Sequence, residues 1–337
     1  MIKAELINTN GKSILIPIPE RASEIKLLQY IDFNTYSSDL IEWLKENHEQ
    51  IESKKWQYII KLIDCLKAFY GDLVDFFELD SSYIDGISKE DLSDHIEIIT
   101  GKKQDHVTAT DTLIQIYNMI FNVIKDSKPE LRVEKHFFYK GQQYEIPAIW
   151  SDTLWNKTNF ESVSVKQAIE VLQVQSNYND VIKDLAKDDK SIANFAFHKY
   201  LSEVSLLALK PDEKIPLAET EFKKFMSERI DLFQDIDLQT VLDIENWFEM
   251  YYSGLRDDKE NYYYFNSKEP GSPEELIAIQ KAKKKNEEVQ KRIGWKSFIS
   301  RMVELRSFSG REKTELESVY TAPFTDAVKM VSIDNSN

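Results

Sequence analysis

The stretch Lys54–Leu79, KKWQYIIKLIDCLKAFYGDLVDFFEL, carries the clearest fold signal in the chain. Its apolar residues recur at intervals of three and four, which places them on one face of an α-helix. The residues with this spacing are Trp56, Ile59, Ile60, Ile63, Leu66, Phe69, Tyr70, Leu73, Phe76 and Phe77. We expect one long amphipathic helix with a bend near Gly71, because glycine is a weak helix former.

Shorter helices are expected on both sides of this stretch. The apolar spacing and the capping residues predict them at Glu24–Phe33, at Ser38–Asn47, after Ser88, and at Thr110–Val123. Ser38 separates the first two, because serine is a frequent helix cap and a weaker former of helix interiors.

Two short β-hairpins are predicted. Alternating apolar residues flank Asn10-Gly11 near the amino terminus, and Val133–Tyr139 and Gln142–Ile146 flank Lys140-Gly141. Each hairpin is followed by proline and then by helical spacing. This common order suggests a duplicated hairpin-plus-helices unit, although a chance similarity between two short hairpins explains it equally well.

The second half contains four further helix patterns. They cover Ser164–Leu185, Ser191–Leu209, Glu219–Phe233 and Leu238–Tyr252. Phe195 belongs to the apolar seam of the second helix, and His198 beside it is expected to be a partly buried structural histidine. Beyond a linker, Ser272-Pro273-Glu274-Glu275 has the cap, proline and acidic residues of a helix start, and this helix could extend to about Arg306.

These patterns define the fold class as mainly α: a helical bundle with two small β-hairpins and a long C-terminal helix. We divide the chain into 1–128 (hairpin plus helices), 129–255 (hairpin plus helical bundle), 256–271 (linker) and 272–337 (basic helical arm).

Composition supports a folded, water-soluble chain. Hydrophobic residues make up 42% of the 337 residues, enough for a sizeable core, and the formal net charge is −15. Residues 268–313 reverse this balance with 12 basic residues against 7 acidic ones.

The amino terminus lacks the features of a signal peptide, and no apolar run is long enough to span a membrane. Cys65, the single cysteine, is expected to be a small buried hydrophobic residue.

No catalytic, cofactor-binding or metal-binding residue is assigned. The five histidines do not occur at ligand spacing, and the chain lacks both a glycine-rich phosphate loop and a G-x-S-x-G motif. We therefore expect a protein that is not an enzyme and needs no cofactor.

The candidate interaction surface lies in the linker and the basic arm. Tyrosine is a common interface anchor, and a run of basic residues suits an acidic partner or nucleic acid. The surface comprises Tyr262, Tyr263, Tyr264, Phe265, Lys283, Lys284, Lys285, Lys291, Arg292 and Trp295. The alternatives are that the aromatic segment packs on the bundle, and that the lysines form a solvated helix face with Glu287 and Glu288.

Three pieces of the second half carry a family resemblance. They are FFYKGQQYEIP at Phe137–Pro147; LLALKP, ERIDLF and Trp247-Phe248 in the helical region; and IGWKSFI at Ile293–Ile299, followed by Glu317–Val319 and Pro323-Phe324. In this order they resemble tail-assembly-chaperone-like and other small structural proteins of tailed phages, chiefly phages of gut Bacteroidetes such as crAss-like phages. Residues 1–130 depart from the shorter pattern of that family, which leaves a virion component open as well as a chaperone.

The resemblance implies a virion structural or assembly protein that acts by protein–protein contacts. Its partners would be other phage structural proteins in an oligomer or larger assembly, in the host cytoplasm during assembly and in the virion. Two alternatives remain open at this point. One is an intracellular enzyme with a scattered active site, and the other is a regulator that binds nucleic acid through the basic arm.

Overall fold

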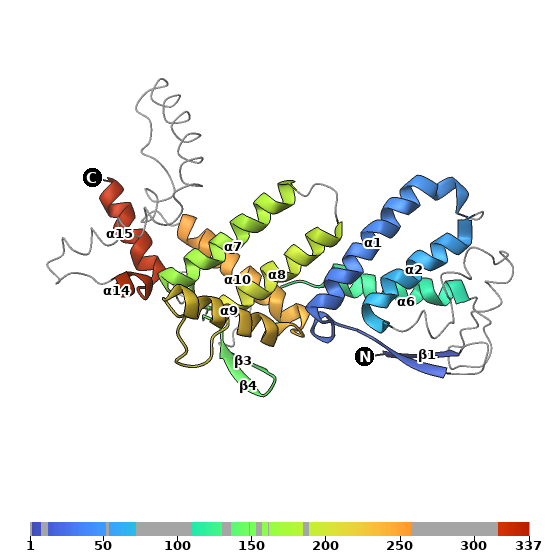
Figure 1. The fold of residues 1–337 in the computed structure, drawn as a ribbon, viewed down its shortest axis with the longest axis horizontal. Coiled ribbons are helices and arrows are strands. Elements are labelled where there is room, and N and C mark those ends of the chain that lie inside the picture. Colours follow the sequence, from blue (N-terminus) through green and yellow to red (C-terminus); the bar gives the residue numbers. More distant parts are fainter. Residues whose placement is uncertain are drawn as a thin grey trace, which may run out of the picture. The chain divides into compact units, whose positions relative to one another are not determined.

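The computed structural model describes residues 2–7, 13–51, 54–71, 109–129, 136–147, 149–152, 157–160, 162–184, 189–257 and 316–336. Its secondary structure is mainly helical, which confirms the expected class (Figure 1). The linker from residue 258 onward and the predicted long helix at 272–306 lie outside the described residues.

The described α-helices are α1 (Leu27–Asn47), α2 (Lys55–Tyr70), α6 (Ala109–Asp126), α7 (Val165–Asp184), α8 (Asp189–Leu207), α9 (Glu219–Phe233), α10 (Leu238–Asp257), α14 (Leu316–Tyr320) and α15 (Phe324–Ser336). Short 3-10 helices occur at Ala22–Glu24 and His48–Gln50. The strands are β1 (Ile2–Ile7), β2 (Ser13–Ile18), β3 (His136–Tyr139), β4 (Gln142–Glu145), β5 (Ile149–Asp152) and β6 (Lys157–Phe160).

The described strands form three antiparallel hairpins rather than the two expected. β1 pairs with β2 and β3 with β4, as the turn signals predicted. The third hairpin, β5 with β6, was missed. Its strands are short and largely polar, so they lack the apolar alternation that marks a half-buried strand.

The helix at the start of the chain is continuous across Ser38. The predicted break is wrong, because α1 runs from Leu27 to Asn47 as one helix. Phe33, Ser37 and Leu40 are all buried at helical spacing. Burial of this continuous face outweighs the weak preference of serine for a cap, and Ser38 itself is exposed to water.

Helix α2 ends at Tyr70 with Gly71 as its C-cap, and the bend expected near Gly71 stays a prediction. The φ angle of Gly71 is +44°, a region that favours glycine, and its N–H donates to the carbonyl of Lys67 over 3.0 Å. The predicted continuation of this helix falls on residues 72–79, which are outside the described residues. Glycine therefore terminates the regular helix.

The chain divides into two compact units. Unit 1 comprises Met1–Glu130, Val181–Tyr200 and Phe233–Leu242, and unit 2 comprises Leu131–Asp180, Leu201–Leu232 and Asp243–Asn337. The division falls within α7, α8 and α10, so these helices contribute residues to both units.

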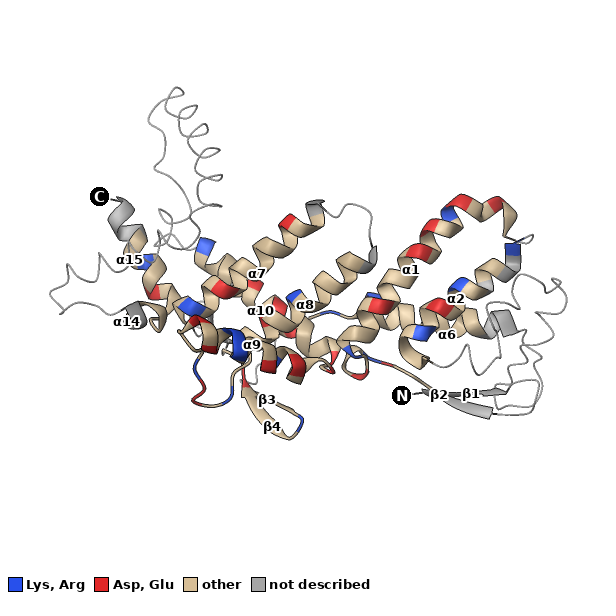
Figure 2. Cartoon of the chain, viewed as in Figure 1, with Lys and Arg blue, Asp and Glu red and all other residues tan. Residues whose placement is uncertain are grey.

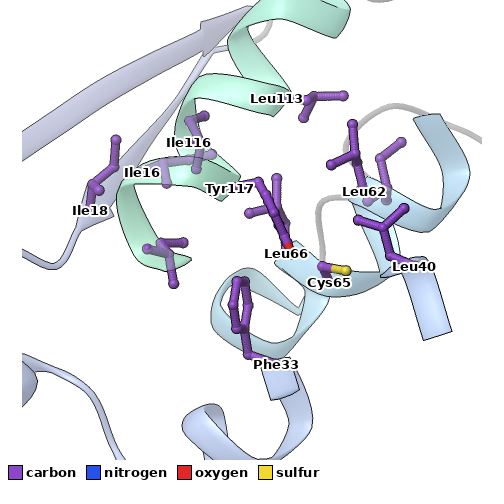
Figure 3. Close-up of a cluster of buried hydrophobic side chains, with 12 residues drawn as sticks. Ile16, Ile18, Phe33, Leu40, Leu62, Cys65, Leu66, Leu113, Ile116 and Tyr117 are labelled. Atoms are coloured by element: carbon purple, nitrogen blue, oxygen red, sulfur yellow. The ribbon is translucent and has the colours of Figure 1, made fainter. Parts of the chain in front are cut away.

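Unit 1 has an apolar core built on α1, α2, α6 and β2. Figure 3 shows side chains from all four elements converging, and Phe33 stacks on Tyr117 with ring centroids 5.3 Å apart. Cys65 belongs to this core and is fully buried, as expected from the sequence. A second, smaller cluster contains Ile25 and Leu238, and backbone hydrogen bonds between these two segments reinforce it.

In unit 2, hydrogen bonds join segments that are far apart in the sequence. Ser164 and Gln167 form a reciprocal capping box at the start of α7, and the Gln167 side chain also donates to the carbonyl of Leu206 over 3.0 Å. The segment just before α15 pairs with the residues before α7: the N–H of Phe324 donates to the carbonyl of Val163 over 2.8 Å.

A three-hydroxyl network fixes the same place. The Tyr251 hydroxyl on α10 lies 3.2 Å from the Ser162 Oγ and 3.1 Å from the Thr325 Oγ1. The Thr325 hydroxyl also donates to the Ser162 Oγ over 3.0 Å. Residues from three distant parts of unit 2 are thereby joined by directional bonds.

Candidate interaction surfaces

The interaction surface predicted from the sequence lies entirely outside the described residues. This applies to Tyr262, Tyr263, Tyr264, Phe265, Lys283, Lys284, Lys285, Lys291, Arg292 and Trp295. Their role in an interface remains a prediction. The described part of the structure offers other candidate residues. Two surfaces stand out, one on the hairpin β3–β4 and one on α8.

The hairpin β3–β4 turns at Lys140-Gly141. Both residues have positive φ angles, +47° and +76°, as a two-residue type I′ turn requires. Gly141 adopts this conformation without the steric cost of a Cβ atom. The turn fixes the register, so Phe137 lies opposite Tyr144 and Phe138 lies opposite Gln143.

One face of this hairpin is buried in unit 2. The Phe137 and Tyr144 rings stack at 5.7 Å, and Tyr144 is fully buried. Glu145 exchanges two backbone hydrogen bonds with Leu209, at 2.6 and 3.1 Å. The Lys140 ammonium donates to the carbonyl of Leu232 at the end of α9 over 3.0 Å, which holds the turn beside that helix (Figure 1). The hairpin is therefore attached at its base and at its turn.

Arg229 on α9 secures the buried face. Its guanidinium group donates to the carbonyls of Ser205 and Ala208 at the end of α8, and to the Glu213 carboxylate over 2.9 Å. The same group lies 5.5 Å from the centre of the Tyr144 ring. Burial lowers the pKa of Arg229, and the nearby Glu213 carboxylate acts in the opposite direction. A buried cation thus satisfies carbonyls that the end of α8 leaves without helical partners.

The other face of the hairpin carries an exposed aromatic pair, which we call the hairpin face: His136 and Phe138. Phe138 is 70% exposed, the most exposed large hydrophobic side chain among those that the structure describes. The two rings meet edge to face, with centroids 6.0 Å apart. Figure 2 shows the hairpin mostly without charge, in contrast to the acidic residues along α1. Such a face is typical of a contact surface.

The second surface is the α8 face: Asn194, Phe195 and His198. Their spacing puts them on one side of the helix, and all three are exposed. Phe195 is 44% exposed, so its assignment to the buried seam was wrong. The prediction of a partly buried His198 was also wrong. Periodicity located the helix correctly, but it could not show that Leu201 is the first fully buried residue among those of α8 whose burial is described.

The described residues offer little to bind a metal ion. Among them there is no group of three or more His, Cys, Asp or Glu side chains that could hold one. No helix within the described part of the chain is long and apolar enough to cross a membrane. The described surface instead offers features suited to protein contacts: exposed aromatic rings, three α8 residues without carboxylates and a strand edge.

Comparison with known proteins adds no relative: no family model, no curated protein and no solved structure matches the chain.

Proposed function

We propose that this protein is a structural or assembly component of a tailed phage and that it acts through protein–protein contacts. The observation that carries the contact role is the presence of uncharged aromatic side chains on the surface of a strongly acidic chain. The phage assignment is supported by the resemblance of the second half of the sequence. The expected partners are other phage structural proteins, met in the host cytoplasm during assembly and retained in the virion if the protein is built into it.

The α8 face suits the recognition of another protein's groove. Asn194, Phe195 and His198 present a strip without carboxylates, whereas the chain as a whole carries −15 charges. An acidic partner is repelled least where no carboxylate faces it. Full burial of a phenylalanine side chain contributes about 1.5–3 kcal/mol, so covering the exposed part of Phe195 would contribute about 1 kcal/mol. This amount suits one anchor among several in an interface.

Quantitative mass spectrometry tests the biological setting. The protein is measured in particles purified from the infected host and in the lysate from which they came. A fixed copy number per particle identifies a virion component, whereas abundance in the lysate without incorporation identifies an assembly factor. If no phage particle is produced by cells that make the protein, the phage assignment fails.

A pair of variants tests the contact role. Phe195→Asp places a charge in the α8 face. Ile41→Asp introduces the same charge at another exposed apolar residue, on α1. We expect Phe195→Asp to reduce co-purification with particle proteins at least tenfold and Ile41→Asp to leave it within twofold. Equal behaviour of the two variants would remove the α8 face from the proposal.

A further inference from the structure

We propose that the outer edge of strand β3 pairs with the same edge of a second copy of this chain. Two hairpins would then form one four-stranded antiparallel sheet, in the order β4, β3, β3 of the second copy, β4 of the second copy. This inference rests on the hairpin alone, and it holds or fails independently of the phage assignment and of the α8 face.

The register determines which backbone groups of β3 point outward. Tyr139 and Gln142 flank the two-residue turn, and in such a hairpin this pair exchanges hydrogen bonds. The next hydrogen-bonded pair is Phe137 with Tyr144. The N–H and C=O groups of His136 and Phe138 therefore point away from β4.

Strand β4 shows that outward backbone groups of this hairpin can form hydrogen bonds with another segment. Glu145 lies opposite His136, and its outward N–H and C=O bond to Leu209. The outer edge of β4 is thus partly covered within unit 2. Among the described strands, β3 pairs only with β4, so within the described part of the chain no strand occupies its outer edge.

The composition of this edge favours a second copy as the occupant. Exposed edges are normally protected by lysine, proline or a bulge, whereas β3 reads His-Phe-Phe-Tyr and contains no proline and no lysine or carboxylate. Two copies of a chain with a net charge of −15 repel each other in general. They can approach where both present a strand without carboxylates, and this edge meets that condition on both sides of a two-fold axis.

One register satisfies the outward groups of both copies. With the two-fold axis at Phe137, Phe138 of each copy lies opposite His136 of the other, and each pair exchanges two backbone hydrogen bonds. Directly opposed residues share a face, so Phe138 would pack on His136 of the second copy, as it packs on His136 of its own strand. The contact is small, and we expect a reversible dimer with a dissociation constant on the order of 100 µM.

Sedimentation velocity on the full chain, over roughly a hundredfold range of concentration centred on this value, tests the proposal. Phe138→Lys puts a charge on the edge, and Gln143→Lys puts the same charge on the opposing residue of β4, away from the edge. We expect Phe138→Lys to weaken dimerisation at least tenfold and Gln143→Lys to change it less than twofold. Circular dichroism confirms that both variants are folded.

Spin labels test the register. In the Gln143→Cys variant, each copy of the chain carries one spin label on β4. In the proposed sheet the two labelled positions are separated by three strand spacings, roughly 16 Å between Cα atoms, and this distance should appear as dipolar broadening of the spectrum. The native Cys65 is fully buried and is left unlabelled. The proposal is overturned if the chain stays monomeric throughout, if Phe138→Lys dimerises like the unaltered protein, or if Gln143→Lys is equally disruptive. A dimer without this broadening overturns the register.

Discussion

The cores of the two units are built from different interactions. In unit 1 the helices α1, α2 and α6 meet through aliphatic and aromatic side chains, with Phe33 between Phe69 and Tyr117. In unit 2 the buried region also contains the guanidinium group of Arg229 and the hydroxyl of Tyr251. The cluster formed by α1, α2, α6 and β2 is held mainly by close packing, whereas the core of unit 2 adds hydrogen bonds from buried side chains to its packing.

This difference concerns how each core determines which of its own segments pack together. Apolar packing is non-directional, so a core of this kind needs complementary shape and sufficient burial. Hydrogen bonds specify particular atoms, and a buried polar group that loses its partner costs free energy. Unit 2 joins Ser162, Tyr251 and Thr325, which are far apart in the sequence, and directional bonds identify which segments meet.

The largest expected effect is loss of packing in unit 1. Phe33→Ala removes a fully buried ring, and we expect it to lower the free energy of unfolding by about 3–5 kcal/mol. Urea denaturation measures the loss, and hydrogen–deuterium exchange should locate it in α1, α2 and α6. The matched control is Phe195→Ala, the same change at an exposed site, which should cost about 1 kcal/mol or less. Equal losses would mean that Phe33 does not hold the core of unit 1.

The next effect is loss of the buried cation in unit 2. Arg229→Met keeps an apolar stem but removes the donors to Ser205, Ala208 and Glu213. Because two buried carbonyls lose a partner, we expect a loss of about 2–4 kcal/mol in denaturation experiments. Lys223→Met, at an exposed ion pair on the same helix, should change stability by less than about 1 kcal/mol. If Arg229→Met is also neutral, packing alone sustains unit 2.

Alkaline pH should weaken unit 1 through its single thiol. Burial raises the pKa of Cys65 to about 12, whereas an unfolded cysteine titrates near about 8.5. Above the lower value the unfolded state releases this proton first, so the stability that the buried thiol provides is lost as the pH rises toward about 12. The contribution of this one group falls by about 1.4 kcal/mol per pH unit within that window.

The measurement compares urea midpoints of the unaltered protein and Cys65→Ala between pH 8 and pH 10.5. Tyrosines whose pKa values are raised by burial, such as the partly buried Tyr70 and the buried Tyr117, contribute to the alkaline loss in both proteins. The unaltered protein should therefore show the steeper decline, and parallel curves would show that the thiol titrates normally in the folded state.

The smallest effect concerns one hydroxyl group in unit 2. Tyr251→Phe keeps the ring but removes the bonds to Ser162 and Thr325, and we expect a loss of about 1–1.5 kcal/mol. A double-mutant cycle with Thr325→Val measures the coupling free energy between the two hydroxyl groups. Coupling of about 0.5 kcal/mol or more would confirm that the hydroxyls act together, and additive losses would show that they act separately.

Local sequence patterns located much of the fold. Helix α9 begins and ends where its apolar spacing predicts, at Glu219 and Phe233, and the turn at Lys140-Gly141 sets the register of β3 and β4. These features depend on residues within one or two turns of each other. Neighbouring residues are fixed by the chain itself, so their spacing predicts the element they form.

Other predictions failed because distant residues outweighed local preference. Ser38 reads as a helix cap, yet α1 continues because Phe33 and Leu40 are buried together. Phe195 matches an apolar seam, yet it lies on the exposed side of α8. No local pattern indicated that Arg229 would be buried, since its partners come from α8 and from the loop that follows it.

The sequence by itself determined that the chain is mainly helical, where most described helices lie, and that Cys65 is buried. Only the tertiary structure decided which apolar side chains reach water and which polar ones are enclosed. The physical reason is that a helix is stabilised by its own backbone hydrogen bonds, whereas burial depends on which surface arrives from elsewhere in the chain. Phe138 and Phe195 remain exposed because no described segment of their own unit covers them fully.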